Sequence, residues 1–203
     1  MKTHSWKLKE IIMVGIIGVL FALISFGTAH GISIPLILPF AAAGLPPNYS
    51  FEVVWGIFFM SATIAAYIIR KPGVSLGAAM LAVLIQFLMG NATGPLIFLS
   101  GLVTGLGAEV GFAVFRYKTW NWASLLLAVV ACTVFSFTLT WWTLGYHALD
   151  MGLALILLAF FTRLTSGIIF ACVIVKLLAD GLARAGVLKS YPVGANVMVD
   201  TDE

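Results

Sequence analysis

Long apolar runs separated by short polar breaks make up most of the chain. A helix needs roughly 20 apolar residues to cross the hydrocarbon of a bilayer, so runs of that length, bounded by charges or turn residues, predict membrane spans. Such runs occupy residues 11–29, 51–69, 74–90, 95–115, 122–144 and 151–175. We therefore predict an all-α, polytopic membrane protein in which residues 1–203 form a single integral membrane domain with six transmembrane helices.

Basic residues predict how these helices are oriented. Every Lys and Arg except Arg163 lies before the first run or after the second, fourth or sixth run, and the connections between the other runs contain none. The positive-inside rule assigns the basic side to the cytoplasm. Both the N and C termini are then expected to be cytoplasmic.

The segment after the first run is apolar but rich in proline. Residues 30–50, HGISIPLILPFAAAGLPPNYS, contain Pro35, Pro39, Pro46 and Pro47. Because proline removes backbone donors and breaks helices, the pattern favours a broken or re-entrant outer segment over a seventh span. Two interpretations remain, a long connector packed on the outer surface and a lid over a site.

Composition narrows the chemistry that the chain can perform. Hydrophobic residues make up 62% and charged residues 9%, which leaves no room for a separate soluble catalytic or nucleotide-binding domain. The sequence has no P-loop motif, and His4, His30 and His147 are isolated, so neither a cofactor nor a metal site is expected. A membrane-embedded enzyme would need nucleophile or acid–base residues at useful spacing, and the sequence shows none.

Two charges are predicted to lie within the hydrocarbon. Arg163 is about 20 Å of helix rise from Lys176, near the midplane, and Glu109 is about 10 Å above the cytoplasmic end of its run. Charges at such depths usually pair with one another or line a cavity. Glu109 is therefore either a partner of Arg163 or a ligand-facing carboxylate at the floor of a cation pocket.

A second group of polar and aromatic residues collects near the predicted outer face. Each one alone is typical of an interfacial aromatic belt or a turn, but together they have aromatic walls and carboxylates without Lys or Arg, which suits a small planar cation. The amide of Gln86 would be costly facing lipid, so we expect it to line a cavity. The group comprises Glu52, Trp55, Gln86, Asn91, Trp141, Trp142, Tyr146, His147 and Asp150.

Small residues form smooth faces on two of the predicted helices. Gly15, Gly18, Ala22 and Ser25 recur at spacings of three and four in the first run, and the fourth run contains the pairs Gly101/Gly105 and Gly107/Gly111. Close packing between helices is the default explanation for such faces.

Several segments resemble one transporter family. The residues WKLKEI (6–11), AYIIRKPG (66–73), LMGNATG (88–94), GLGAEVGFAVFRYKTWN (105–121) and RLTSG (163–167) resemble the YkoE family. Its members are S-components, the substrate-binding subunits of energy-coupling factor (ECF) transporters for thiamine or its hydroxymethylpyrimidine precursor.

The resemblance implies a location, a ligand and partners. It implies a multi-pass protein of a prokaryotic plasma membrane that binds the vitamin near the outer face and does no chemistry on it. It also implies a transmembrane coupling subunit, docked on the face with Gly15, Gly18 and Ala22, together with ATPase subunits that supply energy. The S-component would topple in the bilayer to carry the vitamin inward, with the first outer loop as a gate.

The resemblance also implies roles for the candidate site residues. Because thiamine carries a thiazolium cation, one of Glu52 and Glu109 is expected to face it, while Gln86 and Asn91 hydrogen-bond the aminopyrimidine edge. A Trp or Tyr side chain would stack on a ring; the candidates are Trp55, Trp141 and Tyr146. His147 is a further candidate residue of the substrate site. Two alternatives remain, an S-component for another vitamin and a non-catalytic scaffold or assembly subunit.

Overall fold

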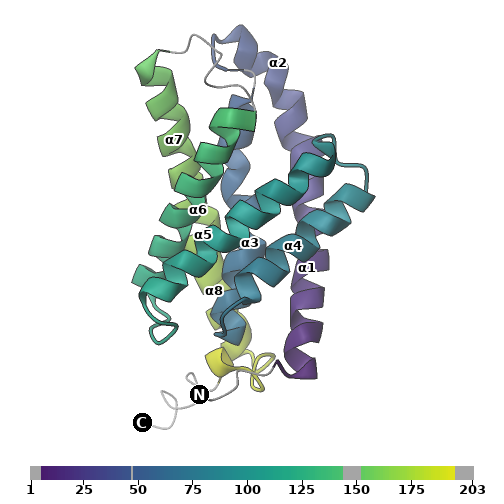
Figure 1. Ribbon diagram of the computed structural model, residues 1–203, viewed down its shortest axis with the longest axis vertical. Coiled ribbons are helices and arrows are strands. Elements are labelled where there is room, and N and C mark those ends of the chain that lie inside the picture. Colours follow the sequence, from purple (N-terminus) through teal and green to yellow (C-terminus); the bar gives the residue numbers. More distant parts are fainter. Residues whose placement is uncertain (1–5, 47, 144–151, 195–203) are drawn as a thin grey trace.

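Every element in the described part of the chain is a helix (Figure 1). The computed structural model describes residues 6–46, 48–143 and 152–194. The helices are α1 (Leu8–Thr28), the π-helix η1 (Ala29–Ser33), α2 (Ile34–Ala42), α3 (Tyr49–Ile69), α4 (Val74–Leu88), the 3₁₀-helix η2 (Gly94–Leu96), α5 (Ile97–Val114), α6 (Trp122–Thr143), α7 (Leu153–Gly167), the π-helix η3 (Ile168–Ile174) and α8 (Val175–Arg184). Five helical stretches are long and apolar enough to cross a membrane, and α4 is a shorter apolar helix. The predicted all-helical membrane fold is thus confirmed.

The first predicted span is longer than the sequence indicated. Residues Leu8–Ala42 form one continuous helical stretch of 35 residues, so the expectation of a broken segment is wrong for residues 30–42. Pro35 lies in the first turn of α2 and Pro39 inside it. The π-helical turn η1 directly precedes them, and such local widening of a membrane helix accommodates backbone groups that proline leaves unpaired.

The last predicted span is also longer than expected. The stretch Leu153–Arg184 has 32 residues and continues beyond the predicted end at residue 175. Its middle, Ile168–Ile174, is again a π-helix, so both terminal stretches contain a change of helical pitch.

The helix α3 is the centre of the fold. It packs against α1, α4 and α7, and its second half, from Phe59 to Ile69, is buried. In Figure 1, α4 and α5 cross obliquely in front of the more upright helices α1, α3 and α7. The helix α5 lies between α4 and α6.

Glycines allow α5 to approach both neighbours closely. A Cβ atom at Gly105 would lie 2.7 Å from Cα of Leu76 in α4, and one at Gly111 would lie 2.2 Å from Cα of Ala128 in α6. The interpretation of these small residues as a helix-packing device is therefore confirmed for α5.

The small residues of α1 pack mostly inside the protein. A Cβ atom at Gly18 would meet the side chain of Leu81 at 2.7 Å, and Ala22 is fully buried, whereas a Cβ atom at Gly15 would have nothing within 4 Å. In the structure, Gly18 and Ala22 are thus contacts within this chain and not an exposed docking face. Large aliphatic side chains form the outward surface of α1: Ile11, Ile12, Ile16, Val19, Leu20, Leu23 and Ile24.

The turns that contain the basic residues gather at one end of the molecule, which we call the basic end. The start of α1 and the end of α8 lie at this end (Figure 1), as do the turns that follow α3 and α5. The segment after α8 contacts the start of α1, where Lys9 donates a hydrogen bond from Nζ to the carbonyl of Ser190 and Tyr191 donates one to the carbonyl of Lys9.

Candidate ligand-binding site

A cavity of about 140 Å³ lies among η1 and the helices α1, α3, α4, α5 and α6. Most of its lining comes from the parts of these helices that are remote from the basic end: the last turn of α1, the start of α2, the first two thirds of α3, the second half of α4 with the connection that follows it, the first half of α5 and the second half of α6. The side chains with polar atoms in the lining are Ser25, His30, Trp55, Ser61, Gln86, Asn91, Thr93, Ser100, Thr104 and Ser136. The cavity therefore lies in the half of the protein where the sequence predicted a pocket.

Gln86 and Asn91, two amides from the predicted set, line this cavity together. Gln86 is 5% exposed and lines the cavity, and no side-chain hydrogen bond of its amide is found among the described residues. Its atoms therefore face open space in the cavity and remain available. Asn91 accepts a 2.9 Å hydrogen bond from the backbone N–H of Thr93 on Oδ1, which fixes the amide and leaves its NH₂ group as a donor.

His30 is a lining residue that the sequence reasoning treated as isolated. It lies in η1, where its ring stacks on Phe26 at a centroid distance of 4.0 Å and its Nδ1 is 3.0 Å from the carbonyl oxygen of Phe26. A carbonyl only accepts, so Nδ1 holds the proton; in the neutral imidazole, Nε2 is then the acceptor. One sequence feature could have identified His30: the first apolar run continues past residue 29 without a charged residue, which is typical of a helix that extends through His30.

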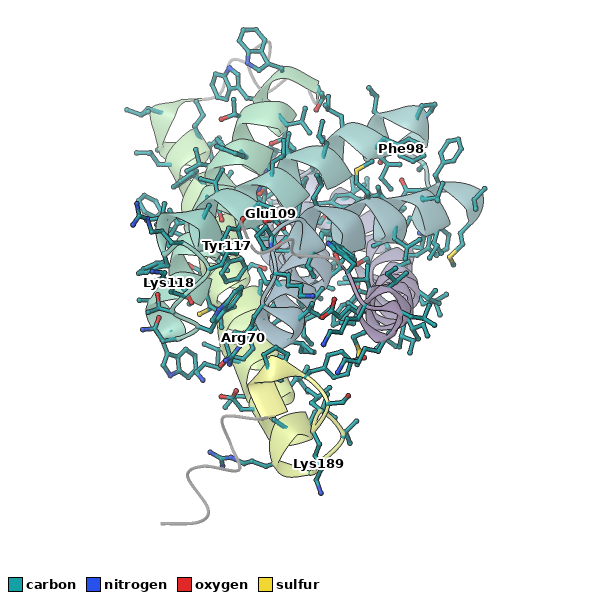
Figure 2. All side chains as sticks on the ribbon, turned by 60° about the horizontal axis from the view of Figure 1, so that its bottom comes forward. Arg70, Phe98, Glu109, Tyr117, Lys118 and Lys189 are labelled. Atoms are coloured by element: carbon teal, nitrogen blue, oxygen red, sulfur yellow. The ribbon has the colours of Figure 1, made fainter. Side chains whose placement is uncertain are left out.

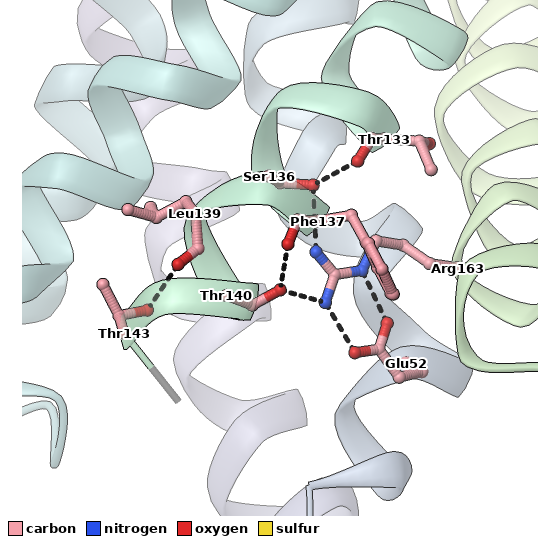
Figure 3. A network of polar contacts seen from close by, with 8 residues as sticks. All are labelled: Glu52, Thr133, Ser136, Phe137, Leu139, Thr140, Thr143 and Arg163. Carbon is pink, nitrogen blue, oxygen red and sulfur yellow. Dashed lines mark hydrogen bonds and ion pairs between the residues drawn. The ribbon is translucent and has the colours of Figure 1, made fainter. Parts of the chain in front are cut away.

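Trp55 lines the cavity and is backed by a buried ion pair. The guanidinium carbon of Arg163 lies 3.7 Å from the centroid of the Trp55 ring. Arg163 donates from Nε and Nη2 to the two carboxylate oxygens of Glu52, both at 2.5 Å, and both side chains are fully buried (Figure 3). Glu52 is thus the partner of Arg163 and is not among the described lining residues.

Glu109 has neither of the two roles that the sequence left open. Its Oε1 accepts a 2.8 Å hydrogen bond from the backbone N–H of Ser75, and its Oε2 accepts one of 2.6 Å from the hydroxyl of Tyr117 (Figure 2). It lies towards the basic end, away from the cavity, and the partner of Arg163 is Glu52. The pairing with Arg163 is wrong because α3, not α5, packs against α7.

Two other residues of the predicted group, Trp141 and Trp142, lie on α6 outside the described lining of the cavity. Trp141 is half-buried there. Tyr146 and His147 lie outside the described residues, as does Asp150, so the structure gives them no position.

The described lining contains no Asp, Glu, Lys or Arg. Its walls are apolar and aromatic, with a few amides, hydroxyls and one imidazole at defined positions, which is typical of small-molecule sites. Because no charge would balance an ion, this surface favours a neutral, planar group with several hydrogen-bonding atoms.

Comparison with known proteins identifies a family model and a solved structure that match this chain. A family model described as "ABC-type cobalt transport system, permease component" matches residues 9–135. A crystal structure of an S-component of an ECF transporter superposes with a TM-score of 0.87 at 33% sequence identity, over 98% of this chain and 96% of that chain.

A curated relative decides the family. The "Putative HMP/thiamine permease protein YkoE" of Bacillus subtilis (strain 168) is 36% identical over 190 residues, which cover 94% of this chain and 91% of the relative. This chain belongs to the YkoE family of S-components. As a YkoE-family protein, it is a substrate-binding subunit of an ECF transporter and a multi-pass protein of the prokaryotic plasma membrane. Its relatives are transporter components and not enzymes.

The description of the family model mentions cobalt, but the described site contains no cluster of metal-binding side chains. Within residues 6–46, 48–143 and 152–194, no group of three or more His, Cys, Asp or Glu side chains is placed to hold a metal ion. The polar atoms of the cavity instead belong mainly to amides and hydroxyls.

Proposed function

We propose that this subunit binds the aminopyrimidine group shared by thiamine and its hydroxymethylpyrimidine precursor, and does no chemistry on it. The name of the curated relative supports this ligand class. The single observation that carries the proposal is the amide of Gln86, which is buried, has no partner within the described residues and lines an uncharged cavity.

The hydrogen-bonding groups of the cavity match an aminopyrimidine edge. Such an edge presents an exocyclic NH₂ donor beside a ring-nitrogen acceptor, and a carboxamide such as Gln86 presents the complementary C=O and NH₂ groups. Nε2 of His30 offers a further acceptor and the NH₂ of Asn91 a further donor. The indole of Trp55 supplies an aromatic wall for the ring.

The size and charge of the cavity favour the pyrimidine ring over the thiazolium ring. Its volume of about 140 Å³ is comparable to the roughly 150 Å³ of an apolar cavity that admits benzene, so it suits one six-membered ring. Glu52 is neutralised by Arg163 and Glu109 lies elsewhere, so neither would pair with a cation here. We therefore expect hydroxymethylpyrimidine to bind at least as well as thiamine.

We further propose that a transmembrane coupling subunit and ATPase subunits act with this chain, because it has no nucleotide-binding motif of its own. Two features support the orientation with both termini in the cytoplasm: the basic turns share one end of the molecule, and the cavity lies in the opposite half. The outward face of α1, beside Gly15, is the docking region we propose.

Titration of the purified protein with thiamine and with hydroxymethylpyrimidine tests the proposal. Gln86→Leu keeps the volume and removes the amide; we expect the dissociation constant to rise about tenfold or more, as for the loss of one buried hydrogen-bonding pair. Thr138→Val, an exposed position on α6 that bonds only to the carbonyl of Val134, is the matched control and should bind as wild type does.

Two results would reject the proposed ligand. One is the absence of binding of either compound to wild type, the result expected for a scaffold subunit. The other is unchanged affinity in Gln86→Leu. Mass spectrometry of ligand released from the purified protein would then identify a different vitamin.

A further inference from the structure

The Arg163 side chain is held from three sides without entering the cavity. Glu52 in α3 binds Nε and Nη2, while Ser136 and Thr140 in α6 accept hydrogen bonds of 3.2 Å and 3.1 Å from Nη1 and Nη2 (Figure 3). Each hydroxyl donates its own proton to a carbonyl of α6, that of Thr133 or Phe137. Both hydroxyl oxygens are therefore oriented as acceptors, and the guanidinium plane is fixed.

The fixed guanidinium in turn contacts two residues of the cavity wall. It stacks at 3.7 Å on the ring of Trp55 and bonds to the hydroxyl of Ser136, and both of these residues line the cavity. Trp55 belongs to α3 and Ser136 to α6. The side chain from α7 thus connects two walls of the site that α3 and α6 supply.

We propose that Arg163, held by Glu52 and Thr140, is a positioning residue for the ligand site: it sets the plane of Trp55 and the hydroxyl of Ser136 and so determines affinity without touching the ligand. The inference rests on the proposed function, because it takes the ring that packs on Trp55 to be an aminopyrimidine. A guanidinium suits this role because its planar fork binds a carboxylate bidentately while its face stacks on an indole.

Thr140 allows this role to be tested without altering the cavity. Its hydroxyl bonds to Arg163, but Thr140 is not among the described lining residues. Thr140→Val removes that acceptor at nearly constant volume, and Thr140→Ser retains it. Thr143, one turn further along α6, is exposed and bonds only to the carbonyl of Leu139, so Thr143→Val is a matched control on the same helix.

Binding of thiamine and hydroxymethylpyrimidine, measured together with the thermal midpoint of the ligand-free protein, is the experiment. We expect Thr140→Val to weaken binding about fivefold, the equivalent of one net hydrogen bond, and to lower the midpoint while the variant remains folded at the temperature of the titration. Thr140→Ser should restore both the affinity and the midpoint. Thr143→Val should bind as wild type does. If Thr140→Val does not fold because the added methyl group meets the guanidinium, Thr140→Ala removes the same hydroxyl without adding a methyl group and takes its place.

The outcomes separate this inference from the proposed function. If wild type binds neither compound, the proposed function fails and this inference fails with it. If wild type binds and a folded Thr140→Val has wild-type affinity, only the positioning role is overturned. Equal weakening in Thr140→Val and Thr140→Ser would also overturn it, because the hydroxyl would then be irrelevant.

Discussion

The hydroxyl of Tyr117 donates a 2.6 Å hydrogen bond to the carboxylate of Glu109, eight residues earlier in the chain. Tyr117 reaches Glu109 because Arg116 and Tyr117 adopt φ values of 53° and 56°, which end α5 and turn the chain back. The second oxygen of the same carboxylate binds the backbone N–H of Ser75 in the first turn of α4. One side chain thereby joins the basic ends of two helices.

Tyr117→Phe should destabilise the fold and leave ligand binding unchanged. It removes a hydrogen bond to a charged acceptor, for which we expect a loss of about 1–3 kcal/mol in the free energy of unfolding. The thermal midpoint in detergent, measured beside a thiamine titration, checks both expectations. A clear loss of affinity for thiamine in the folded variant would contradict this expectation and indicate that Glu109 contributes to ligand binding.

Stability should fall at alkaline pH, in part through Tyr117. Burial, followed by the hydrogen bond to Glu109 and the charge of Glu109, raises the pKa of Tyr117 above its ordinary value of 10.0. A group with a raised folded pKa stabilises the protein fully below the unfolded pKa, and this stabilisation is lost as the pH rises towards the folded pKa. We expect the thermal midpoint to decline above about pH 10, and less steeply in Tyr117→Phe. An equally steep decline in this variant would contradict the assignment to Tyr117.

Removing one partner of the Glu52–Arg163 pair should cost more stability than removing both charges. Glu52→Gln or Arg163→Met alone leaves a buried charge without its counter-ion, for which we expect a loss of about 3–5 kcal/mol. The double variant Glu52→Gln/Arg163→Met leaves no such charge and should lose less than the sum of the single changes. A double-mutant cycle on unfolding free energies measures this coupling, and additive losses would show that the pair does not act as a unit.

Gly111→Ala should destabilise the packing of α5 on α6. The added Cβ atom would lie 2.2 Å from the Cα of Ala128, so the two helices must separate. We expect a loss of about 1–3 kcal/mol or more, as for other overpacked contacts. Gly27→Ala, where a Cβ atom has nothing within 4 Å, is the control and should be neutral or slightly stabilising. Equal thermal midpoints for the two variants would contradict this account of the glycines.

The apolar runs predicted the helices well because the bilayer fixes the length of each span. The same pattern placed the amide of Gln86 in a cavity, since an unpaired amide is costly against lipid. The prolines misled the prediction for residues 30–42, because a π-helical turn that the sequence does not signal allows the helix to continue through Pro35 and Pro39.

Helix adjacency was the information that the sequence lacked. The depths of Arg163 and Glu109 along their runs allowed the two side chains to meet, but depth does not specify which helices are neighbours. The structure places α3 beside α7, so Arg163 pairs with Glu52, and the turn after α5 supplies Tyr117 to Glu109. The role of His30 was missed for a related reason, because its segment was assigned to a connection outside the helix.

The unequal lengths of α1–α2 and α4 have a consequence for the surrounding lipid. At 1.5 Å of rise per residue, the 35-residue stretch Leu8–Ala42 is about 50 Å long, while the 15 residues of α4, which packs on α1, span about 22 Å. A hydrocarbon layer of about 30 Å matches neither, so the long helix must tilt or project, and the layer must thin beside the short one. Hydrophobic mismatch therefore makes the resting tilt of this protein sensitive to acyl-chain length.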